Sequence, residues 1–122
     1  MKNLNTITNN TYKRGVLRFL IFKQGRRYVG VCLDLDLVEE ADSFKKAENV
    51  IFKLAKFHVE TVVKKDLGEK FLNRPAPDKY WKKLDSVRKN ILASNKRTPA
   101  SNQLKQETFN IMSVPMGALM PA

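Results

Sequence analysis

The fold is decided by the stretch Val16-Leu17-Arg18-Phe19-Leu20-Ile21-Phe22, the turn Lys23-Gln24-Gly25-Arg26, and the following run Tyr28-Val29-Gly30-Val31-Cys32-Leu33. Both apolar runs are rich in β-branched and aromatic residues, which is typical of strands. The glycine of the turn supplies the positive φ that a tight hairpin needs. The sequence therefore predicts two antiparallel strands. Because most of their positions are apolar, we expect their sheet to be covered on at least one face.

Outward from the hairpin, Leu37-Val38-Glu39-Glu40-Ala41 predicts a short third strand, and a helix over about residues 43–65 follows. Ser43 lies where a helix N-cap belongs, and Asp42 adds a favourable charge near the helix start. At helical spacing one side of this segment collects Phe44, Ala47, Ile51, Leu54, Ala55, His58 and Val62. We expect this amphipathic helix to lie across the sheet.

The segment after the long helix contains Pro75 and Pro77, which exclude a regular helix and favour an extended crossing. Before them, Phe71 and Leu72 are candidates for an edge strand. A second helix is predicted over residues 78–92, with Tyr80, Leu84, Val87 and Ile91 on one side and Trp81 and Leu92 flanking them.

The predicted fold class is α+β. We expect a three- to four-stranded, mainly antiparallel sheet covered by one long helix, in the order β-β-β-α-β, plus a C-terminal helix. The domain should span residues 13–92. Residues 1–12 are rich in Asn and Thr and predict a flexible arm, and residues 93–122 predict a disordered tail.

Charge is unevenly placed along the 122 residues, whose net charge is +11. Residues 1–33 carry seven basic and no acidic side chains, residues 34–63 carry seven acidic and four basic ones, and residues 64–105 carry twelve basic and four acidic ones. A basic balance attracts polyanions and speeds association with acidic partners. No run of about twenty uncharged apolar residues occurs, and the first residues lack the apolar run of a secretory signal, so we expect a cytoplasmic protein without a membrane span.

Residues 28–36, an acidic strand, a turn containing Asp42-Ser43 and a long helix together resemble the core of HicB-type antitoxins, over about residues 16–66. In that family the turn reads Gly-Asp-Thr and a glutamate stands in the first turn of the helix. Here Ala41 replaces the glycine, and Lys46 stands where the capping-box glutamate would be.

The resemblance implies a partial ribonuclease-H-like fold without nuclease chemistry. It implies a protein that binds and blocks a small basic RNA-cleaving toxin of the HicA type, and it makes a homodimer reasonable. Many members carry a C-terminal DNA-binding segment, whereas the residues after Pro77 here predict one helix rather than a paired unit. We therefore expect a protein that is not an enzyme and that needs no cofactor.

Candidate site residues fall into two groups. The acidic group, Asp34, Asp36, Glu39 and Glu40, is a candidate docking surface for a basic partner; a solvated edge that discourages strand aggregation is the alternative. The basic group is the candidate nucleic-acid surface, together with Tyr80 and Trp81, although packing of the second helix on the core explains the two aromatics equally well. The basic group consists of Lys79, Lys82, Lys83, Arg88 and Lys89.

The sequence gives little support for a catalytic site or a metal site. The acids, with Asp42, lie in one loop and strand, whereas a metal site needs ligands from several elements, so no metal is predicted. His58 is the sole histidine and lies within the apolar stripe, which favours a packed, hydrogen-bonded role over general-base catalysis. Cys32 is flanked by Val31 and Leu33 and is expected to act as a small apolar strand residue.

Overall fold

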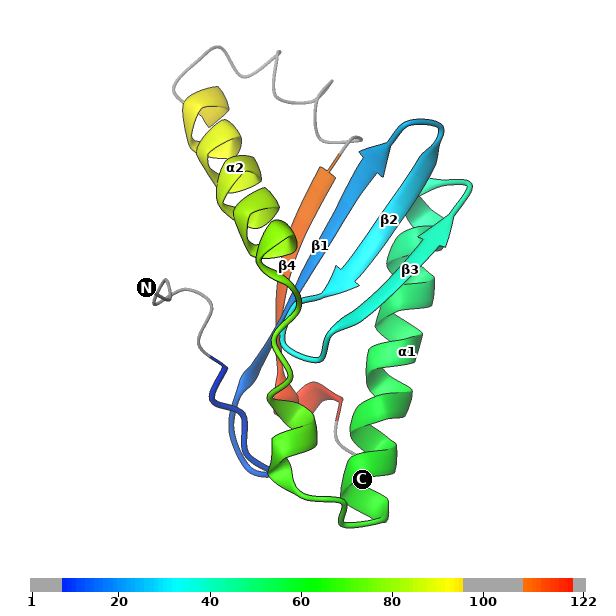
Figure 1. Cartoon of the computed structure of the whole chain (residues 1–122), viewed down its shortest axis with the longest axis vertical. Helices are drawn as coiled ribbons and strands as arrows, with labels where there is room; N and C mark the ends of the chain where they lie inside the picture. Colours follow the sequence, from blue (N-terminus) through cyan, green and yellow to red (C-terminus); the bar gives the residue numbers. More distant parts are fainter. Residues whose placement is uncertain (1–7, 96–108, 120–122) are drawn as a thin grey trace.

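The computed structural model describes residues 8–95 and 109–119. The elements are β1 (Val16–Gln24), β2 (Arg27–Cys32), β3 (Leu37–Ala41), α1 (Phe44–Lys64), the 3₁₀ turn η2 (Glu69–Leu72), α2 (Asp78–Asn95), β4 (Phe109–Pro115) and the 3₁₀ turn η3 (Met116–Ala118). The strands form one antiparallel sheet in the order β3-β2-β1-β4 (Figure 1). The predicted α+β class is confirmed, with α1 packed against this sheet.

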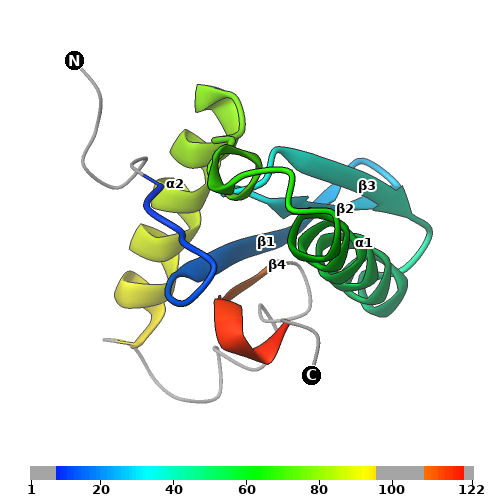
Figure 2. The ribbon, with the colours of Figure 1, turned by 90° about the horizontal axis from the view of Figure 1, so that it is seen from below.

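The sheet is covered on both faces, with α1 on one side and α2 on the other (Figure 2). Alternation along β1 explains why the central strands read as almost continuously apolar. Leu17, Phe19 and Ile21 belong to the core under α1, whereas Leu20 and Phe22 belong to the core under α2. The expectation that at least one face of the sheet is covered is therefore confirmed, because both faces are covered.

Helix α1 begins as its sequence predicts. Ser43 has an extended conformation, and its side chain accepts a hydrogen bond from the backbone N–H of Lys46 at 3.2 Å. The buried face of the helix consists of Ala47, Ile51, Ala55, Val59 and Val62. The predicted stripe was centred slightly off this line, because Leu54 and His58 are only half-buried.

Gly30 allows α1 to approach β2 closely. A Cβ placed on Gly30 would lie 2.8 Å from Cγ2 of Ile51 and 2.9 Å from the backbone oxygen of Ala47. The helix backbone itself is one of these neighbours and cannot rotate away as a side chain can. The small residue in the strand therefore sets the distance between helix and sheet.

We expect Gly30→Ala to destabilise the protein by about 1–3 kcal/mol, because overpacking forces helix and sheet apart. Urea denaturation followed by circular dichroism measures this loss. Gly117→Ala is the matched control, since a Cβ there meets nothing within 4 Å. Equal stability of the Gly30 variant and the control would contradict the close packing.

Helix α2 packs through Trp81, Leu84 and Val87, all buried. Leu84 and Val87 of the predicted stripe are buried, whereas Tyr80 is only half-buried and Trp81, predicted to flank the stripe, is 3% exposed. Trp81 is fixed from two sides. Its Nε1 donates to the backbone oxygen of Ala76 at 2.9 Å, and the guanidinium of Arg18 lies 4.6 Å from its ring centroid. These contacts lie outside the helix, so helical spacing alone does not reveal them.

The tail prediction for residues 93–122 was wrong over most of its described part. Helix α2 continues to Asn95, and residues 109–115 form β4, which pairs with β1 from Val16↔Pro115 to Phe22↔Phe109. Met116 and Leu119 then complete the core under α1. The sequence Phe109–Pro115 mixes polar and apolar residues and ends in Pro, so it does not by itself predict a strand, and pairing with the free edge of β1 stabilises it. Residues 96–108 and 120–122 lie outside the described part.

The boundary of the N-terminal arm was also placed too late. Residues 1–7 lie outside the described part, but Asn10 is buried. Its side chain donates to the backbone oxygen of Leu72 at 2.9 Å and accepts from the backbone N–H of Val16 at 2.8 Å. A buried amide that is satisfied on both sides anchors the chain before β1. The domain therefore begins before residue 13.

The predicted edge strand at Phe71 and Leu72 is instead part of the turn η2. Residues 73–77 do form the predicted extended crossing. Its backbone N–H groups at Arg74 and Ala76 donate to the backbone oxygens of Asp34 and Leu33, each at 2.8 Å. This pairing carries the chain from the α1 face of the sheet to the α2 face.

Candidate functional site: a groove between the second helix and the sheet

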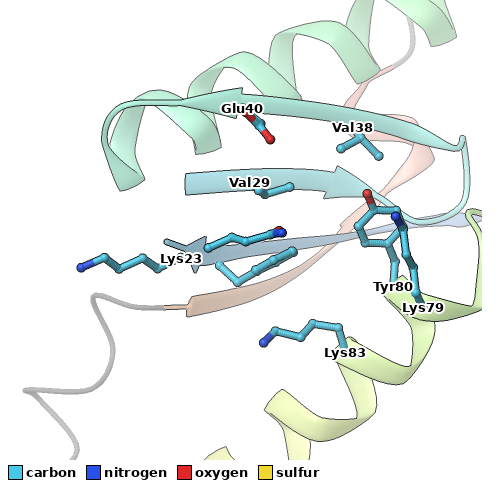
Figure 3. Close-up of a pocket in the computed structure, with 9 residues that line it drawn as sticks. Lys23, Val29, Val38, Glu40, Lys79, Tyr80 and Lys83 are labelled. Carbon is cyan, nitrogen blue, oxygen red and sulfur yellow. The ribbon is translucent and has the colours of Figure 1, made fainter. Parts of the chain in front are cut away.

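A groove of about 420 Å³ lies between the first turns of α2 and the sheet (Figure 3). Its size falls within the roughly 300–1,000 Å³ typical of ligand sites. The lining comes from β1, β2, β3 and α2, so no single segment of sequence contains the site. The lining residues are Phe22, Lys23, Gln24, Val29, Val38, Glu40, Lys79, Tyr80 and Lys83.

The floor of the groove is apolar. Phe22 and Val29 are buried in the core under α2, whereas Val38 on β3 is 37% exposed. In Figure 3 the side chains of Lys79 and Tyr80 reach from α2 toward β3, where Val38 lies. The groove is therefore open along the part of the sheet that α2 does not cover.

The rim of the groove is basic. Lys79 and Lys83 come from successive turns of α2. Lys23, at the end of β1, touches the groove but directs its ammonium to the α1 face of the sheet, where its Nζ lies 6.0 Å from the ring centroid of Tyr28. The Nζ of Lys83 lies 5.2 Å from the ring centroid of Phe22, and the Nζ of Lys79 lies 5.0 Å from that of Tyr80. Among the side chains that the structure describes, the ion pairs involve neither Lys79 nor Lys83.

Glu40 is the one acidic residue in the lining. It faces Arg27, whose Nε lies 3.7 Å from its Oε2, and both side chains are more than half exposed. Such a pair contributes little to stability, but it offsets the negative charge next to the lysines. The groove consequently has a net positive charge over an apolar floor.

The predicted basic group is divided by the structure. Lys79 and Lys83 line the groove, whereas Lys82, Arg88 and Lys89 lie outside its lining. Lys82 and Lys89 are exposed and Arg88 is half-buried. Gln24 was missed, because it follows the first apolar run and nothing in the sequence places it opposite a helix more than fifty residues later. The packing of α2 on the sheet brings it there.

The predicted acidic docking group loses Asp34, which is 1% exposed. Its carboxylate accepts hydrogen bonds from the Nη2 of Arg18 at 2.7 Å, from the Nε of Arg18 at 3.2 Å and from the backbone N–H of Arg18 at 2.7 Å. The ring of Trp81 lies against the same guanidinium. A partner cannot reach this carboxylate, so Asp34 has a structural role.

The other members of the acidic group lie on or beside the outer strand β3. Asp36 and Glu40 are exposed and Glu39 is half-exposed. Asp36 adopts a left-handed conformation with φ of 54°, which Asp tolerates in a turn. Asp42, one residue beyond the strand, pairs with the exposed Lys46 at 3.2 Å. Among the strands that the structure describes, none pairs with the outer edge of β3.

His58 and Cys32 occupy the environments that their sequence positions predict. The Nε2 of His58 lies 2.7 Å from the backbone oxygen of Phe71, so this half-buried ring joins α1 to η2. Cys32 is fully buried in β2, and burial raises the pKa of its thiol far above the usual range. That thiol therefore stays protonated near neutral pH and is a poor nucleophile.

Within residues 8–95 and 109–119, no group of three or more His, Cys, Asp or Glu side chains is arranged to hold a metal ion. In the same part of the chain, no helix combines the length and apolar character needed to span a bilayer. Comparison of the chain with protein-family models, with curated proteins and with solved structures gave no match.

Proposed function

We propose that this chain is a non-catalytic binding protein of the HicB antitoxin type, which binds and neutralises a small basic RNA-cleaving toxin of the HicA type. The observation that carries the proposal is the open edge of β3, flanked by Asp36, Glu39 and Glu40. The strand-helix order and the residues of the resemblance over about 16–66 support it. The cytoplasm, where a partner that cleaves RNA would act, is the compartment that this proposal implies.

An open edge strand offers a row of backbone donors and acceptors to a partner strand. β3 is short, with five residues, and carries acidic side chains on both faces of the sheet. Self-pairing through β3 is disfavoured, because it brings glutamates of two copies together. A basic strand gains the same backbone hydrogen bonds with favourable charge pairing, so the edge favours a basic partner over a second copy.

Charge reversal on β3 is expected to weaken toxin binding. Glu39→Arg and Glu40→Arg should each reduce affinity about tenfold or more, since close charge pairs across interfaces couple by roughly 1.5 kcal/mol or more. The measurement is co-expression with the small basic protein encoded beside the gene, followed by co-purification and titration calorimetry. Growth rescue from the toxin provides a second readout.

The matched control is Glu60→Arg, which makes the same charge change at a half-buried position on α1. It should bind the toxin as the unchanged protein does. The antitoxin proposal fails if no toxin-like protein is encoded beside the gene or none co-purifies. Equal losses in the β3 variants and the α1 control would instead show that net charge, rather than the strand edge, governs binding.

A further inference from the structure

We infer that the groove between α2 and the sheet is a binding site for single-stranded nucleic acid, with Lys79 and Lys83 on the phosphates and Tyr80 against a base. This site lies on the α2 face of the sheet and does not depend on toxin binding at the β3 edge. It also differs from the basic surface that the sequence predicts, because three strands contribute to its lining.

The charge of the groove selects an anionic ligand. Lys79 and Lys83 come from successive turns of α2 along one side of the opening, and the described ion pairs neutralise neither of them. Lys82, exposed on the same helix, extends the positive surface beyond the groove. A row of ammonium groups beside an apolar groove suits a flexible phosphate chain whose bases lie in the groove.

The aromatic side chain selects bases that are free to stack. Tyr80 is half-buried, with its phenol ring at the wall of the groove (Figure 3). A base can stack on such a ring only when it is not already stacked in a duplex. The apolar floor of Phe22, Val29 and Val38 accepts the flat faces of bases, and the amide of Gln24 can both donate and accept hydrogen bonds at a base edge. These features favour a single strand over a duplex.

The test is fluorescence anisotropy of a labelled twelve-nucleotide oligouridine titrated with the full chain at several salt concentrations. Binding should weaken linearly on a log–log plot, by about 0.7 per phosphate contact. Lys79→Gln/Lys83→Gln should lower affinity on the order of tenfold at low salt and reduce the slope by about 1.4, since two contacts are lost. Lys53→Gln/Lys56→Gln, two exposed lysines of α1, is the control with equal charge loss and should keep the slope.

The stacking contact has its own test. Tyr80→Leu keeps an apolar side chain against the core under α2. It should lower the affinity for the oligonucleotide about tenfold without changing the salt slope, whereas Tyr80→Phe should bind the oligonucleotide normally. Circular dichroism and urea unfolding establish that each variant is folded.

Three results would overturn the inference. The first is no binding of the oligonucleotide at low salt. The second is an equal loss in the α1 control, which would mean that overall charge alone attracts the strand. The third is competition by polyglutamate as strong as that by unlabelled oligouridine, which would assign the groove to acidic protein segments. None of these results decides the toxin proposal, because Glu39→Arg, which tests toxin binding, lies outside the groove lining.

Discussion

A chain that ends at residue 108 is expected to lose its native fold. Residues 109–115 pair with β1 along seven positions, and the residues after them close the core under α1. Met116 is 0% exposed and Leu119 is 1% exposed. Loss of one such side chain typically costs about 2–5 kcal/mol, and loss of both with a whole strand approaches the roughly 5–15 kcal/mol that stabilises a domain. The central strand β1 would also become an open apolar edge, which favours aggregation.

Circular dichroism and size-exclusion chromatography of the truncated chain measure this effect. Two point variants distinguish the contribution of the buried core side chain to the free energy of unfolding from that of an exposed strand position. Met116→Ala should lower the free energy of unfolding by about 2–5 kcal/mol, whereas Ser113→Ala, at an exposed position of β4, should change it by less than about 0.5 kcal/mol. A truncated chain with an unchanged urea midpoint would show that β4 does not belong to the folding unit.

Asp34→Ala is expected to destabilise the protein by about 3–5 kcal/mol, because it leaves the Arg18 guanidinium largely buried without its carboxylate. The side chain of Arg18 is 18% exposed and that of Asp34 is 1% exposed. The substitution also removes the acceptor of the Arg18 backbone N–H. Urea denaturation provides the measurement. The control is Glu40→Ala, which breaks an exposed ion pair and should cost less than about 1 kcal/mol.

A double variant, Arg18→Met/Asp34→Leu, distinguishes the two parts of this loss. Removal of both charges should recover much of the stability, since apolar replacement of a buried pair is often nearly neutral. The backbone N–H of Arg18 still lacks its acceptor, so about 1–3 kcal/mol should remain lost. If Asp34→Ala proves as stable as Glu40→Ala, Asp34 has no structural role.

Most of the fold follows from local patterns. The hairpin around Gly25, the third strand, the N-cap at Ser43 and the extended crossing at the two prolines all depend on neighbours within a few residues. Strand β4 does not. Its sequence has no strong preference of its own, and it becomes a strand because β1 offers a long unpaired edge. Contacts with high sequence separation therefore account for the wrong tail prediction.

The candidate site divides in the same way. Lys79 and Lys83 could be predicted as members of a basic helix, and Glu39 and Glu40 as members of an acidic strand. The partner of Asp34 could not be predicted, because Arg18 lies sixteen residues earlier and meets it only when β1 and β2 pair. Burial thus converts one acid of the cluster into a structural residue and leaves the others exposed.

The amino-acid order alone specifies the strands of the hairpin, the amphipathic helix and the sign of the charge on each segment, since these depend on periodicity and composition. Packing of α2 on the second face of the sheet, the pairing of β4 with β1 and the assembly of the groove from Gln24, Lys79 and Tyr80 arise only in the folded chain. The physical reason is that burial and strand pairing join residues far apart in sequence, and their free energy exceeds any local preference.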